Sequence, residues 1–175
     1  MSILEIVSLP DPVLRTEARK VRAFTSELRQ LADDMVETMR AAPGVGLAAP
    51  QVGLSRQVIV VEYAEPPNDP QAEPPTPELF RLVNPEITRR SPETSLGSEG
   101  CLSIPGYYGE VERHQAVTVR GFTPEGELTL IEAKGWLARI FQHEVDHING
   151  ILFPDRATRV WKLEEDETGE VSALA

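Results

Sequence analysis

The chain has 175 residues, of which 41% are hydrophobic and 26% charged, a composition typical of a water-soluble globular protein. It is long enough to form one domain that buries a core without disulfide bonds. Its formal net charge of -11 argues against direct binding to nucleic acid or to an anionic membrane, because both attract basic surfaces.

The sequence also suggests where the protein works. Residues 1–6 lack the charged and then apolar pattern of a secretory signal, and no apolar run is long enough to cross a membrane. A single cysteine, Cys101, excludes an internal disulfide bond and suits a reducing compartment. We therefore expect a cytoplasmic protein.

The first predicted element is an amphipathic helix over residues 25–40, with Thr25 or Ser26 as its N-cap. Its apolar residues recur at helical spacing and are Leu28, Leu31, Met35, Val36 and Met39. A glycine-rich loop covers residues 44–53, and the β-branched residues 58–61 predict a buried strand.

The middle of the chain is rich in proline, with six prolines among residues 66–77. This composition predicts an exposed loop. A strand is predicted at residues 80–83, ended by Asn84 and Pro85. Residues 116–122 and 127–132 flank a turn and predict a β-hairpin.

A second helix is predicted over residues 135–149, ending before Gly150. Short strands and two helices, in no alternating order, predict an α+β fold. We expect residues 1–160 to form a single catalytic domain and residues 161–175 to form an acidic, flexible tail.

The second helix contains the sequence His-Glu-Val-Asp-His at residues 143–147. Residues four apart lie on one helix face, so His143 and His147 can bind one metal ion. Glu144 lies beside the first ligand, where it can exchange a proton with a water on the ion. The alternative is that these histidines are hydrogen-bonded core residues, since the helix also has an apolar face.

Two histidines leave a catalytic ion short of a third protein ligand. Cys101 would complete a three-ligand set with one open position, although a free cysteine is often only a core residue. Glu164 or Glu165 in the tail would instead give a zinc endopeptidase. A third alternative is a binding module without activity, in which the metal ion only stabilises the fold.

Three segments resemble, in order, the signature motifs of peptide deformylases. They are residues 44–51 (Gly-Val-Gly-Leu-Ala-Ala-Pro-Gln), residues 99–103 (Glu-Gly-Cys-Leu-Ser) and residues 143–147. Residues 9–15 are also similar to the amino-terminal stretch of that family. The resemblance covers residues 5–155 and implies small antiparallel β-sheets packed around a central helix that carries the metal motif.

The resemblance implies removal of the formyl group from the N-terminal formylmethionine of new polypeptides, with release of formate. It assigns the metal to Cys101, His143 and His147. The ion is expected to be Fe(II) in the cell, with Zn(II), Ni(II) or Co(II) as possible substitutes. Glu144 matches the general acid and base of the family.

Further roles follow from the same resemblance. Gln51 and the backbone N–H of Leu102 match the groups that stabilise the oxyanion of the tetrahedral intermediate. The residues that match positions near the methionine side chain are Val45, Gly46, Gly100 and Ile140.

The expected partners are N-formylmethionyl peptides and nascent chains. Some bacterial members of the family dock on the ribosome through a basic carboxy-terminal helix. We expect at most a transient contact with the ribosome, and not through the tail, because residues 162–167 of this chain are net acidic.

Overall fold

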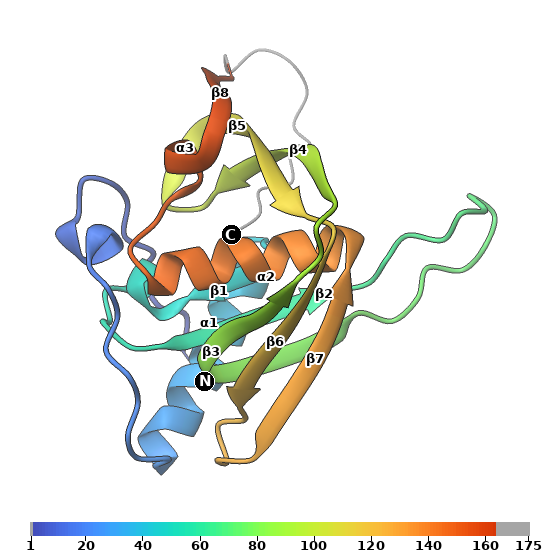
Figure 1. Ribbon diagram of the computed structural model, residues 1–175. Coiled ribbons are helices and arrows are strands. Elements are labelled where there is room, and N and C mark those ends of the chain that lie inside the picture. The colour runs from blue at the N-terminus through green and yellow to red at the C-terminus, as the bar shows by residue number, and fades with distance from the viewer. Residues whose placement is uncertain (1, 164–175) are drawn as a thin grey trace.

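The computed structural model describes residues 2–163, in which two antiparallel sheets enclose one buried helix (Figure 1). The first sheet has the order β1-β2-β3-β6-β7, and the second has the order β4-β5-β8. The strands of the first sheet are β1 (Gly46–Ala48), β2 (Val58–Tyr63), β3 (Glu78–Arg90), β6 (Ala116–Phe122) and β7 (Leu128–Lys134). Those of the second sheet are β4 (Thr94–Cys101), β5 (Ile104–His114) and β8 (Ala157–Lys162). The α+β prediction is confirmed.

The two longer helices lie on the two faces of the larger sheet, and a short third helix packs against the smaller sheet. They are α1 (Ser26–Ala41), α2 (Gly135–Ile148), the short α3 (Phe153–Arg156) and the 3-10 turns η1 (Pro12–Arg15) and η2 (Ala49–Val52). Helix α1 packs on one face, where its apolar residues meet Val58, Val60 and Val83. Helix α2 packs on the other face and separates the two sheets (Figure 1).

Helix α2 is buried from Ala138 to Ile148, which is unusual for a helix with this many polar residues. Its apolar side, with Ile140, Phe141 and Val145, packs into the core of the larger sheet. Its polar side faces β4 and β5, so charged groups lie between the helix and the smaller sheet.

Two predicted boundaries differ from the structure. Strand β3 does not end at Asn84 and Pro85 but continues to Arg90 through a register shift between Val83 and Glu86. Asn84 adopts a positive φ of 51°, and its side chain bonds the N–H and C=O of Val21. Proline is tolerated at such a bulge, because no ladder hydrogen bond is required there.

The carboxy-terminal boundary also lies farther along the chain. Trp161 and Lys162, which we placed in the acidic tail, belong to strand β8 and pair with Tyr108 and Tyr107. The remainder of that tail, residues 164–175, lies outside the described residues. Residues 66–77 are exposed and connect β2 to β3 in an arm that projects from the molecule (Figure 1). Among the described residues, no helix has the length and apolar character needed to cross a membrane.

The start of α1 supplies a test of the fold. The hydroxyl of Thr25 accepts a hydrogen bond from the N–H of Leu28 at 3.3 Å, as an N-cap does. Thr25→Ala should lower the free energy of unfolding by about 1 kcal/mol and Tm by about 2–4 °C. Ser26→Ala is the control, because its hydroxyl reaches only exposed Glu27. Equal effects in thermal unfolding would contradict the capping role.

Candidate active site

Three side chains that could bind a metal ion converge from two elements, α2 and β4. Helix α2 supplies His143 and His147 one turn apart, and Cys101 is the last residue of β4. Their ligand atoms all lie within 4.8 Å of one another, and all three residues are buried. The Sγ atom of Cys101 is 3.5 Å from Nε2 of His147, which is 3.2 Å from Nε2 of His143. A thiolate and two imidazoles packed this closely fit a divalent transition metal, so the site could hold one.

The β4–β5 hairpin brings Cys101 to this position. The ladder is irregular between Gly100 and Cys101, and the chain turns back at once so that Cys101 pairs with Ile104. A Cβ on Gly100 would lie 2.6 Å from the ring of Tyr108, so only glycine fits there without a shift. Burial raises the pKa of the Cys101 thiol well above its usual range, although hydrogen bonds from the backbone of Ser103 and Ile104 oppose the shift. A bound cation would favour the thiolate instead.

A buried carboxylate, Glu99, fixes the first histidine. Its Oε1 atom lies 2.9 Å from Nδ1 of His143. Arg113 donates to both of its oxygens, at 2.9 and 2.8 Å, and Arg139 donates to Oε2 at 2.7 Å. Burial alone would raise the pKa of Glu99, but the hydrogen bonds from Arg113 and His143 outweigh it and hold that pKa well below its usual range. The bond to Nδ1 leaves Nε2 of His143 directed at Cys101 and His147, where a ligand atom is needed.

Asp146 extends this network along the helix. Its Oδ2 atom accepts hydrogen bonds from Arg113 and Arg156, both at 2.6 Å. Arg113 therefore joins Glu99 on β4 to Asp146 on α2, and it is itself nearly inaccessible to solvent.

Glu144 lies on the side of the helix that faces β1. It is fully buried, and neither of its carboxylate oxygens has a hydrogen-bond partner in the described part of the chain. A Cβ on Gly46 would lie 2.6 Å from its Oε1 atom. Burial, followed by the charge of Glu99, raises the pKa of Glu144 well above its usual range. A buried carboxyl without a partner usually marks a functional group, since isolated burial is costly.

Gln51 approaches the same centre from η2. Its Oε1 atom accepts from the N–H of Ala48 at 3.0 Å, which directs the amide nitrogen to the site. That nitrogen lies 3.3 Å from Oγ of Ser103 and 3.6 Å from Sγ of Cys101. Leu102 follows Cys101 in the turn, and its side chain packs on the α1 side of the core.

The four residues matched to the methionine pocket lie around this centre in different environments. Gly46 lies beside Glu144, and Gly100 lies beneath the ring of Tyr108. Val45 is half-buried, whereas Ile140 is fully buried in the core between α2 and the larger sheet.

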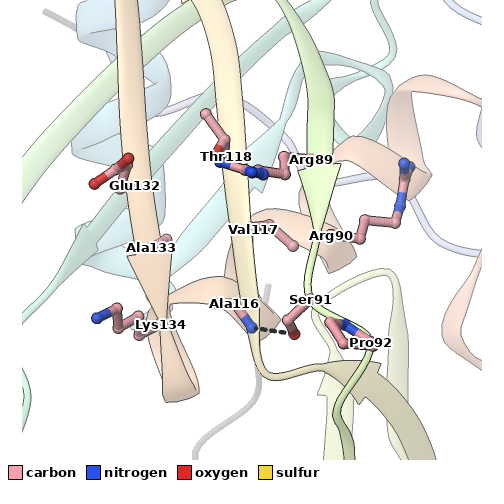
Figure 2. Close-up of a pocket in the computed structure, with 10 residues that line it drawn as sticks. All are labelled: Arg89, Arg90, Ser91, Pro92, Ala116, Val117, Thr118, Glu132, Ala133 and Lys134. Atoms are coloured by element: carbon pink, nitrogen blue, oxygen red, sulfur yellow. Dashed lines mark hydrogen bonds between the residues drawn. The ribbon is translucent and has the colours of Figure 1, made fainter.

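A separate hollow of about 310 Å³ lies where β3, β6 and β7 come together at one end (Figure 2). Basic side chains border it, among them Arg89, Arg90 and Lys134, and the hydroxyl of Ser91 accepts a hydrogen bond from the N–H of Ala116. None of its lining residues belongs to the group around Cys101.

The roles of Glu99, Ser103, Arg113 and Arg139 in this centre were not predicted from the sequence, although Glu99 and Ser103 lie within the motif at residues 99–103. One signal was available. Along α2 the polar residues recur at positions 139, 142, 143, 146 and 147, a helical stripe that includes both histidines. A stripe that includes two candidate metal ligands is expected to face another part of the protein, so its other members, among them Arg139, were candidates for buried contacts.

The fold and the site together indicate a metallohydrolase, because Cys101, His143 and His147 form a possible metal site beside the carboxylate of Glu144. The family model for polypeptide deformylase matches residues 3–162. A peptide deformylase of Desulforudis audaxviator (strain MP104C) is 47% identical over 165 residues, which cover 94% of this chain and 100% of the relative.

Solved structures agree with the sequence comparison. A class I type b peptide deformylase from Acinetobacter baumannii, bound to Met-Ala-Ser, superposes with a TM-score of 0.80 at 43% identity, covering 89% of this chain and 99% of that one. The peptide deformylase from Thermotoga maritima also gives a TM-score of 0.80, at 38% identity, covering 91% of this chain and 100% of the other.

The chain belongs to the peptide deformylase family, and its reaction is removal of the formyl group from N-terminal formylmethionine. The alternatives of a zinc endopeptidase and of a binding module without activity receive no support from these comparisons.

The contact between Gly46 and Glu144 gives a test of the site. Gly46→Ala should displace the Glu144 carboxylate, because the new Cβ would overlap it. We expect kcat to fall about 100-fold, as for a misplacement of about 1 Å, while bound metal is retained. Steady-state formate release and metal analysis measure the two effects. Gly44→Ala is the control, since its Cβ would meet Cδ1 of Leu102 at 3.2 Å, the carbonyl oxygen of Gly46 at 3.6 Å and Cγ of Met39 at 3.9 Å, with no Glu144 atom among these nearest neighbours. A Gly46→Ala variant with normal kcat would show that the carboxylate position is unimportant.

Proposed function

We propose that Cys101, His143 and His147 hold one divalent metal ion and that Glu144 moves the proton during deformylation. The observation that carries this proposal is the convergence of three buried donor atoms within 4.8 Å, beside a buried carboxylate that has no hydrogen-bond partner among residues 2–163. Imidazole and thiolate donors suit Fe(II), Zn(II), Ni(II) and Co(II), and we propose Fe(II) as the ion used in the cell.

When bound, the ion supplies a Lewis acid that polarises a carbonyl and lowers the pKa of a water. The proton transfers are carried out by a side chain of the protein. Glu144 accepts a proton from the attacking water while the oxygen of that water bonds to the formyl carbon. Glu144 then gives that proton to the departing amine nitrogen as the C–N bond breaks. The products are formate and a free amino terminus.

Gln51 and the N–H of Leu102 are proposed to donate hydrogen bonds to the oxyanion of the tetrahedral intermediate. The hydrogen bond from Ala48 supports this role for Gln51, because it holds the amide with its nitrogen toward Cys101. Removing such a preorganised donor typically costs about 3 kcal/mol of transition-state stabilisation.

The proposed substrates are N-formylmethionyl peptides and nascent chains in the cytoplasm. Met-Ala-Ser bound to the Acinetobacter baumannii relative supports peptides of this kind. We propose that Val45, Gly46, Gly100 and Ile140 lie near the methionine residue. Any ribosome contact would use a surface other than the acidic tail, whose residues 164–175 are outside the described structure.

The proposal is tested by formate release from formyl-Met-Ala-Ser. Protein loaded anaerobically with Fe(II) or Ni(II) should release formate rapidly. Glu144→Gln should retain the metal but lose about 100- to 10,000-fold in kcat, because the proton acceptor is gone. Metal content is measured in the same samples. Near-normal turnover by this variant would remove Glu144 from the mechanism.

A second variant tests the ligand set. Cys101→Ala should lose most of its metal after dialysis, since two imidazoles alone hold an ion weakly. Circular dichroism checks that the variant remains folded, and elemental analysis gives the metal-to-protein ratio. Full retention of metal would indicate another third ligand and would contradict the proposed site.

A further inference from the structure

A buried arginine lies between the two elements that carry the metal donors. Arg139 is 3% exposed and stands one turn before His143 on α2, so the two side chains share a face of the helix. Its guanidinium donates to Oε2 of Glu99 at 2.7 Å, to the carbonyl of Val111 at 2.8 Å and to the carbonyl of Ser95 at 2.8 Å. A single side chain of α2 is thus tied to both β4 and β5.

Gly97 provides the space that this arrangement needs. A Cβ at position 97 would lie 2.7 Å from Cζ of Arg139 and 2.9 Å from its Nε and Nη2 atoms. Gly97 pairs with Val111 across the β4–β5 ladder, so the guanidinium lies over the ladder at this pair. Trp136 lies near the same guanidinium, with its ring centroid 5.4 Å from Cζ. Any larger residue at position 97 would push the guanidinium off the strand.

The contacts of Arg139 lead to the metal donors by a short path. Arg139 and His143 bond different oxygens of the same carboxylate, Oε2 and Oε1 of Glu99. Glu99 lies two residues before Cys101 on β4. The position of Arg139 therefore affects both the orientation of His143 and the separation between β4 and α2.

We propose that Arg139 is a positioning residue, seated over Gly97, that sets the distance between Cys101 on β4 and the two histidines on α2. It touches none of the donor atoms and acts through Glu99 and the backbone of the smaller sheet. The planar guanidinium of Arg139 is required, because the single ammonium of a lysine cannot donate to one carboxylate and two carbonyls in the same plane. This inference rests on the proposed metal site.

The test uses Co(II) as a probe of the metal site in wild type, Arg139→Lys, Arg139→Met and Gly97→Ala. Wild type should show a thiolate-to-cobalt charge-transfer band. In the three variants we expect altered d–d absorption and Co(II) dissociation about 10- to 100-fold faster, as for lost support of a ligating histidine. In formate-release assays, the three variants should have a lower kcat with little change in KM. Arg139→Lys should be milder than Arg139→Met. Arg156→Gln is the control, because Arg156 bonds Asp146 in the same network but does not contact Glu99.

A double mutant separates this role from general destabilisation. Gly97→Ala acts by displacing Arg139, so adding it to Arg139→Ala should cause no further loss of Co(II) affinity. Additive losses would overturn the inference, as would folded Arg139 variants with the wild-type spectrum and dissociation rate. If Arg139→Met does not fold, the Co(II) spectra and dissociation rates of Arg139→Lys and Gly97→Ala are compared with those of wild type instead. A wild-type protein without the charge-transfer band would overturn the proposed metal site itself, and this inference with it.

Discussion

Glu99 holds together the two elements on which the site depends. It is fully buried on β4, and it bonds His143, Arg113 and Arg139. A carboxylate and two guanidinium groups at this depth are stable only because each finds charged partners at hydrogen-bond distance. Removing one partner from such a buried cluster typically costs about 3–5 kcal/mol. The same bonds that offset the burial of charge also orient the histidine, so stability and function share one network.

The arrangement follows from a helix with two buried sides. The apolar side of α2 packs on the larger sheet, as in any α+β domain. Its polar stripe, which would normally face water, is covered by the smaller sheet. Arg139, Gln142, His143, Asp146 and His147 all bond or approach groups on β4 and β5. Glu144 projects between these two sides, toward β1, and among the described residues it forms no hydrogen bond with the ionic network that surrounds Glu99.

Much of the larger sheet and both long helices could be predicted from the sequence, because their residues follow simple periodicities. Thr25, one of the two N-cap candidates, is the cap of α1, and residues 116–122 match β6. Strands β4, β5 and β8 were missed. In β4 only Leu96 and Cys101 are apolar among polar residues and glycines, and they are too few and too far apart to form an alternating apolar pattern. Its order comes from pairing with β5 and from contacts to α2, which are distant in sequence.

For the site as well, features set by neighbouring residues could be predicted from the sequence, whereas contacts between distant segments could not. The spacing of His143 and His147 is a local property of a helix, and it was sufficient to indicate a metal site. Cys101 was predicted as the third ligand because two histidines are one ligand short and because the family resemblance assigns it. The residues alone left Glu164 and Glu165 as alternatives. The partners Glu99, Arg113 and Arg139 could not be found in this way, because charged residues are usually exposed and only the tertiary structure shows that these are buried.

The most direct test of the account is X-ray absorption spectroscopy of the protein loaded with one Zn(II) ion. The proposed ligand set predicts one sulfur scatterer at about 2.3 Å and two imidazole nitrogens at about 2.0–2.1 Å, with the fourth position filled by a light atom. A first shell without sulfur, or with only one imidazole, would contradict the assignment of Cys101, His143 and His147 as the ligands.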